Sequence, residues 1–196
     1  MTLETTKILG GIGAVLMLVS PIGTQMGLAG LAGIILVMIA IYRLSYHYNE
    51  PAIFNNALYG AIIAIVGIAV FMAVMAVTLV DLMTALGIDI NWTNWTNWTM
   101  YQNIHWEQIT DWNTYWPYIA IIIADFVILF ISFTIAGTFL RKTFHLLGEK
   151  TGIHAFHTAA TLVFIGALLT IIAVGLLLIW IALIFLAIAF FSIRTT

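Results

Sequence analysis

One acidic residue lies deep inside an apolar stretch, where a carboxyl group can serve as an ion or proton relay. Asp125 follows Trp116 by nine residues in the apolar segment 116–140, so in a helix it lies about 13 Å from the start of that segment. Placing a carboxylate there costs at least ~2.5 kcal/mol, and such residues usually face a cavity or a partner. The alternative to a relay is a protonated or hydrogen-bonded carboxyl that links helices, which is slightly favoured because no basic residue lies at comparable depth. Its candidate partners are three hydroxyl side chains: Thr78, Ser132 and Thr134.

The histidines raise the question of a metal site, because imidazoles and carboxylates are common zinc ligands. His154 and His157 are three residues apart and would share one face of a helix. His145, Glu149 and His47 are expected on the same side of the membrane. However, the chain has no His-Glu-x-x-His motif and no cysteine, so we interpret these histidines as residues at helix ends. Neither a metal site nor any other cofactor is predicted.

Residue patterns typical of other functions are missing from the sequence. There is no Ser-His-Asp order, no pair of carboxylates and no nucleotide fingerprint, and without cysteine there is neither a disulfide nor a thiol nucleophile. The formal net charge of −2 and the absence of a basic cluster give no footprint for nucleic acid. We therefore predict a protein that is not an enzyme and does not bind nucleic acid.

Three acceptor sequons for N-glycosylation follow one another in a long polar stretch: Asn91-Trp92-Thr93, Asn94-Trp95-Thr96 and Asn97-Trp98-Thr99. A single sequon is weak support because chance matches are common, whereas three in tandem are stronger. The sequence thus predicts glycans on Asn91, Asn94 and Asn97 and an external location for this stretch. The alternative is a tryptophan-rich repeat whose acceptor sequences are coincidental.

Six of the seven tryptophans lie in or beside the same polar stretch: Trp92, Trp95, Trp98, Trp106, Trp112 and Trp116. Indole rings favour the headgroup layer, which predicts a belt that lies on the outer surface of the membrane. The alternative is a docking surface for a partner, since tryptophan is a frequent anchor of protein interfaces.

These residues must be positioned by helices that lie in a membrane. The chain is 63% hydrophobic and 7% charged, with a mean hydropathy of +1.12, whereas soluble domains carry about 25% charged residues. We predict an all-α fold, a polytopic transmembrane helical bundle that forms a single domain over 1–196. Six spans are favoured, with one long external loop at 83–115: 8–22, 26–45, 57–82, 116–140, 157–174 and 176–193. Five spans are the alternative, if the C-terminal apolar run is one long helix rather than a hairpin that turns at Gly175.

The basic residues orient the predicted spans. With six spans, all six lysines and arginines fall on one side: Lys7, Arg43, Arg141, Lys142, Lys150 and Arg194. The loop at 83–115 contains no basic residue. Because positive residues mark the cytoplasmic face, both termini are predicted to be cytoplasmic and the loop extracellular, in the plasma membrane. No cleavage site follows the first apolar run, so that run is expected to be a retained span and not a signal peptide.

Glycines are frequent in the first two predicted spans: Gly10, Gly11, Gly13, Gly23, Gly27, Gly30 and Gly33. Small residues let helix backbones approach closely in lipid, so these glycines predict a tightly packed hairpin. The sequence at 12–16 (IGAVL) is echoed at 165–169 (IGALL). This echo indicates either two hairpins of similar design or a chance match between apolar segments.

Three further segments resemble a known family: LETTKILGGIG at 3–13, NEPAIFNNAL at 49–58 and FHLLGEKTG at 144–152. They are similar to a mainly archaeal multi-pass membrane family catalogued as domain of unknown function 996. The resemblance covers nearly the whole chain except the tryptophan-rich loop. It implies an archaeal cytoplasmic membrane and a compact helical fold, and it implies no reaction and no functional residues.

Two functions follow from these patterns. The first is a non-catalytic accessory or scaffold subunit of a larger membrane assembly, which packs against other membrane proteins or against itself and presents a glycosylated external loop. Its support is the scarcity of polar groups in the spans, the glycine-rich faces and the tryptophan-dense loop. The alternative is a small ion or solute channel or transporter that uses the intramembrane Asp125.

Overall fold

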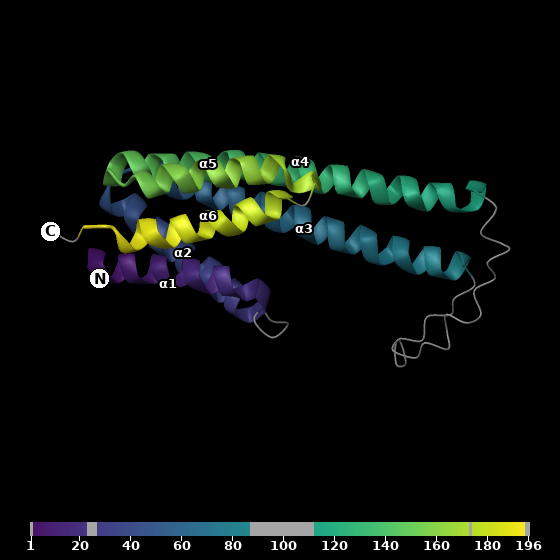
Figure 1. The fold of residues 1–196 in the computed structure, drawn as a ribbon, viewed down its shortest axis with the longest axis horizontal. Coiled ribbons are helices and arrows are strands. Elements are labelled where there is room, and N and C mark those ends of the chain that lie inside the picture. Colours follow the sequence, from purple (N-terminus) through teal and green to yellow (C-terminus); the bar gives the residue numbers. More distant parts are fainter. Residues whose placement is uncertain (1, 23–26, 87–111, 173, 195–196) are drawn as a thin grey trace. The chain divides into compact units, whose positions relative to one another are not determined.

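The computed structural model describes residues 2–22, 27–86, 112–172 and 174–194 of the chain (Figure 1). These residues form α-helices and two short 3-10 helices, without a strand. In chain order the elements are α1 (Leu3–Val19), η1 (Ser20–Ile22), α2 (Gly27–His47), α3 (Pro51–Ala85), α4 (Trp112–Thr151), α5 (His154–Leu168), η5 (Thr170–Ile172) and α6 (Val174–Phe191). The predicted all-α class is confirmed.

Four of these helices, α2, α3, α4 and α6, are long and apolar enough to cross a membrane. Crossing the hydrocarbon layer takes about 20 residues, and α1 and α5 have only 17 and 15 residues. The fold is therefore that of a polytopic helical membrane protein, while the number of spans stays a prediction. The C-terminal apolar run forms two helices, α5 and α6, as the six-span interpretation requires.

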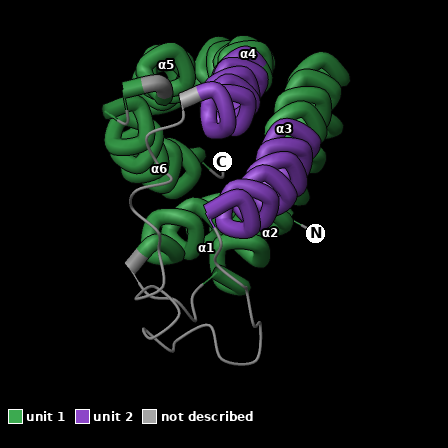
Figure 2. The backbone as a smooth tube through the Cα atoms, turned by 90° about the vertical axis from the view of Figure 1, so that its right-hand side faces the viewer, with its two compact units in different colours: residues 1–65, 132–196 green, residues 66–131 purple. Residues whose placement is uncertain are grey.

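The contacts divide the chain into two compact units (Figure 2). Unit 1 comprises Met1–Ile65 and Ser132–Thr196, and unit 2 comprises Val66–Ile131. The helices α3 and α4 each contribute residues to both units. Whether the whole chain acts as one membrane domain stays a prediction, and each unit is described by itself below.

Two glycine-packed hairpins build much of unit 1. In the pair α1 and α2, a Cβ added at Gly13 would lie 2.8 Å from the carbonyl oxygen of Gly33, and one added at Gly33 would lie 2.6 Å from that of Gly13. In the pair α5 and α6, Gly166 stands in the same relation to the Gly175 carbonyl, at 2.9 Å. Only glycine permits backbones to come this close. The predicted tight packing of the first hairpin is confirmed, and the echoed segments at 12–16 and 165–169 both contain a glycine at the crossing.

The helix α1 also packs against α6, which joins the two hairpins. Near the N-terminus of the chain, Gly10 and Gly11 make room for the rings of Phe190 and Phe191. At the other end of α1, the indole Nε1–H of Trp180 donates a hydrogen bond to the Leu18 carbonyl oxygen at 2.8 Å. This bond uses the indole as both an apolar body and a donor.

The two segments between predicted spans at 46–56 and 141–156 are largely helical. The turn after α2 is short, with Asn49 in the left-handed region (φ 51°), and Pro51 opens α3 at a position where proline needs no backbone N–H. The helix α4 continues beyond Leu140 and ends at Thr151, just before Gly152, whose φ of 70° suits glycine. Polar and charged residues end an apolar stretch without ending a helix, so these helices extend beyond the apolar stretches.

Two other predicted boundaries were wrong by about one turn. The helix α4 begins at Trp112, before Pro117, because a proline near a helix start removes only one backbone hydrogen bond. The reversal between α5 and α6 contains Leu169 and η5, so Gly175 lies inside α6 and not at the pivot. There it provides the close approach to α5.

Unit 2 consists of the C-terminal part of α3 and the N-terminal part of α4. The rings of Phe71 and Phe126 pack edge to face at 5.2 Å between centroids. About half of the other large apolar side chains described in this unit are exposed, including Met72 and Val77 at 62% each. In the most apolar 18-residue segment of α3, and in that of α4, only 11% of the residues are buried. The corresponding share is 28% in α2 and 33% in α6.

Candidate functional site

The intramembrane carboxyl group singled out from the sequence lies in unit 2. Asp125 is on α4 and only 2% exposed, one residue before Phe126 and its contact with Phe71. Neither carboxyl oxygen has a hydrogen-bond partner among the described residues. The predicted bonds from Thr78, Ser132 or Thr134 are therefore not formed, and Thr134 is itself unsatisfied at its hydroxyl.

A buried polar group without a partner is expensive, and an unpaired charge more so. Asp125 thus needs something that the described chain does not supply, such as a proton, a cation or a donor group. Groups of this kind occur where a protein handles ions or protons within a membrane. The sequence slightly favoured a carboxyl group that links helices through a hydrogen bond, but Asp125 forms no such bond with the described residues.

The histidines form a small network at the junction of α4 and α5 in unit 1. The Nδ1 atoms of His145 and His157 are 2.9 Å apart, and Nε2 of His145 lies 3.5 Å from Oε1 of Glu149. A consistent proton arrangement has His157 donating from Nδ1 to His145, and His145 donating from Nε2 to the carboxylate. Gly148 permits the His157 ring to lie against its backbone.

This network does not form a metal site in the described part of the chain. Among those residues, no group of three or more histidine, aspartate or glutamate side chains could hold an ion. His154 and His157 do share a face of α5, with ring centroids 6.3 Å apart. The ring of His47 instead packs edge to face against Tyr48, with 5.0 Å between ring centroids.

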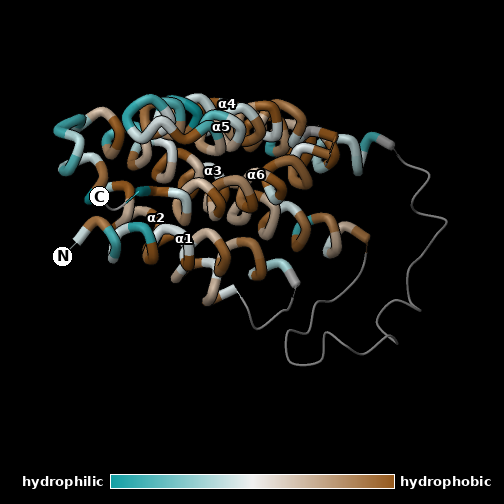
Figure 3. Tube along the Cα trace, turned by 60° about the vertical axis from the view of Figure 1, so that its left-hand side comes forward, coloured by the Kyte–Doolittle hydropathy of each residue, from teal (hydrophilic) through white to brown (hydrophobic). Residues whose placement is uncertain are grey.

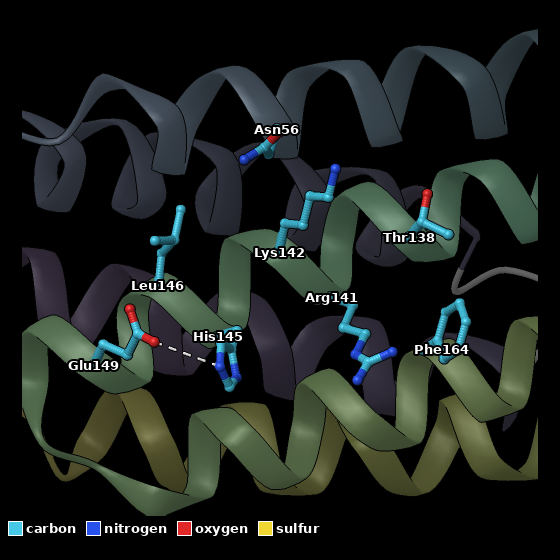
Figure 4. A pocket seen from close by; sticks show the side chains of 8 residues that line it. All are labelled: Asn56, Thr138, Arg141, Lys142, His145, Leu146, Glu149 and Phe164. Carbon is cyan, nitrogen blue, oxygen red and sulfur yellow. Dashed lines mark ion pairs between the residues drawn. The ribbon is translucent and has the colours of Figure 1, made fainter.

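A polar groove lies beside the histidine network, also in unit 1, and the sequence did not predict it (Figure 4). It has a volume of about 540 Å³ and runs along one face of α4, with Asn56 of α3 on one side and Phe164 of α5 on the other. Its α4 residues recur at intervals of three and four: Thr138, Arg141, Lys142, His145, Leu146 and Glu149. That helical spacing was a usable signal, but the segment after 140 was taken for a linker.

The charged residues of unit 1 gather toward the end that carries both chain termini (Figure 3). Glu50, at the start of α3, and Lys150, at the end of α4, form an ion pair there at 3.0 Å. The other charged residues of this unit are Glu4, Lys7, Arg43, Arg141, Lys142, Glu149 and Arg194.

The remaining predicted site residues belong to the tryptophan-rich loop. Asn91, Asn94 and Asn97 lie outside the described residues, as do Trp92, Trp95, Trp98 and Trp106, and the side chain of Trp112 is likewise not described. Trp116, on α4, is 58% exposed. The predicted glycans and the membrane belt therefore stay predictions.

Comparison with known proteins agrees with the resemblance noted in the sequence. The sequence profile of the family described as "Protein of unknown function (DUF996)" matches residues 29–184. The uncharacterized protein MJ1644 of the archaeon Methanocaldococcus jannaschii is 28% identical over 194 residues, which cover 98% of this chain and 94% of that protein. No solved structure matches. With four-fifths of its length matched by one profile, the chain belongs to the DUF996 family of proteins of unknown function.

Proposed function

We propose that this chain is a non-catalytic accessory or scaffold subunit of a larger assembly in the archaeal plasma membrane. The observation that carries the proposal is a set of small side chains exposed on both helices of unit 2. On α3 these are Ala69, Ala73 and Ala76, and on α4 they are Ala120 and Ala124. Spacings of three and four residues place each set along one face of its helix.

Small residues in such rows are the usual contact faces between transmembrane helices, because they let backbones approach and gain van der Waals contact. Within unit 1 the same device joins α1 to α2 through Gly13 and Gly33, where the chain supplies both sides. In unit 2 the alanine rows on α3 and α4 are exposed. Only 11% of the most apolar 18-residue segment of either helix is buried by the chain. A second membrane subunit, or a second copy, fits these rows.

The orientation completes the proposal. The clustering of basic residues in unit 1 supports cytoplasmic termini, and the loop at 83–115 would then be extracellular and carry glycans at Asn91, Asn94 and Asn97. Hexose-bearing peptides that span these three asparagines, found by mass spectrometry of native protein, would support this part. Unmodified peptides throughout would remove it.

The test is purification of the tagged, full-length chain from its native membranes in a mild detergent. We expect a partner, or a second copy, at a fixed stoichiometry. Ala73→Phe should abolish or strongly weaken that association, because the ring holds the two helices apart. The matched control is Val70→Phe, which places the same ring on the same helix, at a side chain that is 41% exposed but outside the alanine row. A chain that purifies as a monomer, or equal effects of the two variants, would refute the subunit role.

The second candidate is a small channel or transporter, and the buried, unpartnered Asp125 favours it. In purified protein reconstituted into liposomes, this role predicts ion or proton flux that Asp125→Asn removes, since the amide retains the shape but cannot carry the charge. Asp81→Asn on the exposed surface of α3 is the control. Flux that depends on Asp125 would replace the subunit role as the proposed function. Liposomes without ion or proton flux would exclude the channel or transporter role.

A further inference from the structure

The groove on α4 contains two cations that no carboxylate neutralises. Among the described residues, neither Arg141 nor Lys142 takes part in an ion pair, while nearby Lys150 is paired with Glu50 at 3.0 Å. The Arg141 guanidinium instead lies over the Phe164 ring at 4.8 Å. A ring holds a cation in place without cancelling its charge, so the N–H donors remain available to an anion.

The two side chains flank the groove from opposite sides. In Figure 4, Lys142 extends toward α3, where Asn56 lies, and Arg141 extends toward Phe164 on α5. An anion that lies along α4 would therefore meet a positive charge on each side and the amide of Asn56 above. The one acid of the groove, Glu149, faces His145 and stands seven residues beyond Lys142, about 10 Å further along the helix axis.

The position of the groove along the helices indicates the kind of anion. Arg141 and Lys142 follow immediately after the apolar segment 116–140, and Asn56 immediately precedes the apolar segment 57–82. On α3 and α4 the polar groups thus begin where the hydrocarbon layer is expected to end. The adjacent headgroup layer contains the lipid phosphates. Leu146 and Phe164 add apolar walls.

We propose that this groove binds a phosphate group, supplied by the headgroup of an anionic membrane lipid. Arginine pairs with two phosphate oxygens at once, and lysine adds a second positive charge. Basic pockets between transmembrane helices on the cytoplasmic side are suited to such headgroups. The site is independent of the proposed subunit role and of Asp125, because it uses only residues of unit 1.

The test uses native mass spectrometry of the delipidated full-length protein, titrated with phosphatidylglycerol, with phosphatidylcholine and with inorganic phosphate. We expect phosphatidylglycerol to bind more tightly than phosphatidylcholine, whose own cation competes for the phosphate. The double variant Arg141→Gln with Lys142→Gln should weaken phosphatidylglycerol binding roughly tenfold or more, the loss expected for charge-assisted hydrogen bonds.

The control removes the same two charges elsewhere in unit 1, with Lys7→Gln and Arg194→Gln. It should leave binding within about twofold, because neither Lys7 nor Arg194 lines the groove. Arg141 and Lys142 are both exposed, so their double variant should keep the thermal stability of the wild type in detergent without lipid.

Three results would count against the proposal. Equal losses in the two double variants would mean general attraction to positive charge, and equal affinity for the two lipids would mean that no anionic phosphate is recognised. Binding of inorganic phosphate without lipid, with the same dependence on Arg141 and Lys142, would retain the phosphate site but overturn the lipid as its source.

Discussion

At the scale of single residues, Asp125 is the feature that the fold explains least. Its side chain is buried without a hydrogen bond, in a helix pair whose other described side chains are nearly all apolar. Desolvation of such a group opposes folding, and nothing in the described chain offsets that penalty. The channel or transporter role, the second candidate above, is the proposal that gives this carboxyl group a use.

This leads to a prediction about stability. Asp125→Leu, which exchanges the carboxyl group for a branched apolar one with the same number of non-hydrogen side-chain atoms, should stabilise the protein by about 1–3 kcal/mol. In detergent the midpoint of thermal unfolding should rise by a few degrees, roughly 2–4 °C per kcal/mol for a chain of this size.

The same substitution at Asp81, an exposed acid on α3, is the control and should change the midpoint little. A fall in the midpoint for Asp125→Leu would show that the carboxyl group has a partner in the folded protein. The structural explanation of this residue would then have to be abandoned.

At the scale of elements, the glycines decide how the hairpins of unit 1 pack. Replacing glycine by alanine inside a helix normally stabilises it by up to about 1 kcal/mol. At Gly13 the sign should reverse, because the added Cβ would lie 2.8 Å from a backbone oxygen and 2.9 Å from the Leu36 Cβ. Forced contacts of this kind cost about 1–3 kcal/mol.

We therefore expect Gly13→Ala to lower the midpoint of thermal unfolding, measured by circular dichroism in detergent. Gly27→Ala is the matched control on α2, since none of the described residues lies within 4 Å of a Cβ added there. That variant should be neutral or more stable. If both alanines behave alike, the close crossing of α1 and α2 is not a determinant of stability.

The elements also show what a single sequence can and cannot predict. The long apolar helices and the glycine hairpin were predictable, because apolar length and small residues act locally. The helical continuation of α4 beyond Leu140 was missed, because charged residues end a membrane span without ending a helix. As a result, the groove that contains Arg141 and Lys142 was missed too.

Other parts depend on contacts between distant segments, which no local pattern reveals. The position of the reversal before α6 follows from the approach of Gly175 to Gly166, and the single polar residue of η5, Thr170, is a weak signal for a turn. The hydrogen bond from Trp180 to Leu18 joins residues 162 positions apart. The missing partners of Asp125 likewise became evident only when the neighbouring side chains were placed.

At the scale of the whole molecule, the central claim is a polytopic helical membrane protein with six spans and both termini in the cytoplasm. Three observations support this claim: the predicted location of all basic residues on one side, the even number of α-helices among the described residues, and the clustering of charge in unit 1. It also sets the side on which the proposed phosphate groove and the proposed glycans would lie.

Thiol labelling of intact cells tests this claim most directly, and the absence of native cysteine makes the background clean. Single cysteines would replace Glu4 on α1, His154 at the junction of α4 and α5, and Gln102 in the loop at 83–115. The account predicts that a membrane-impermeant maleimide labels Gln102→Cys in intact cells, and labels Glu4→Cys and His154→Cys only after the membrane is permeabilised. Labelling of Glu4→Cys or His154→Cys in intact cells, or protection of Gln102→Cys, would contradict it.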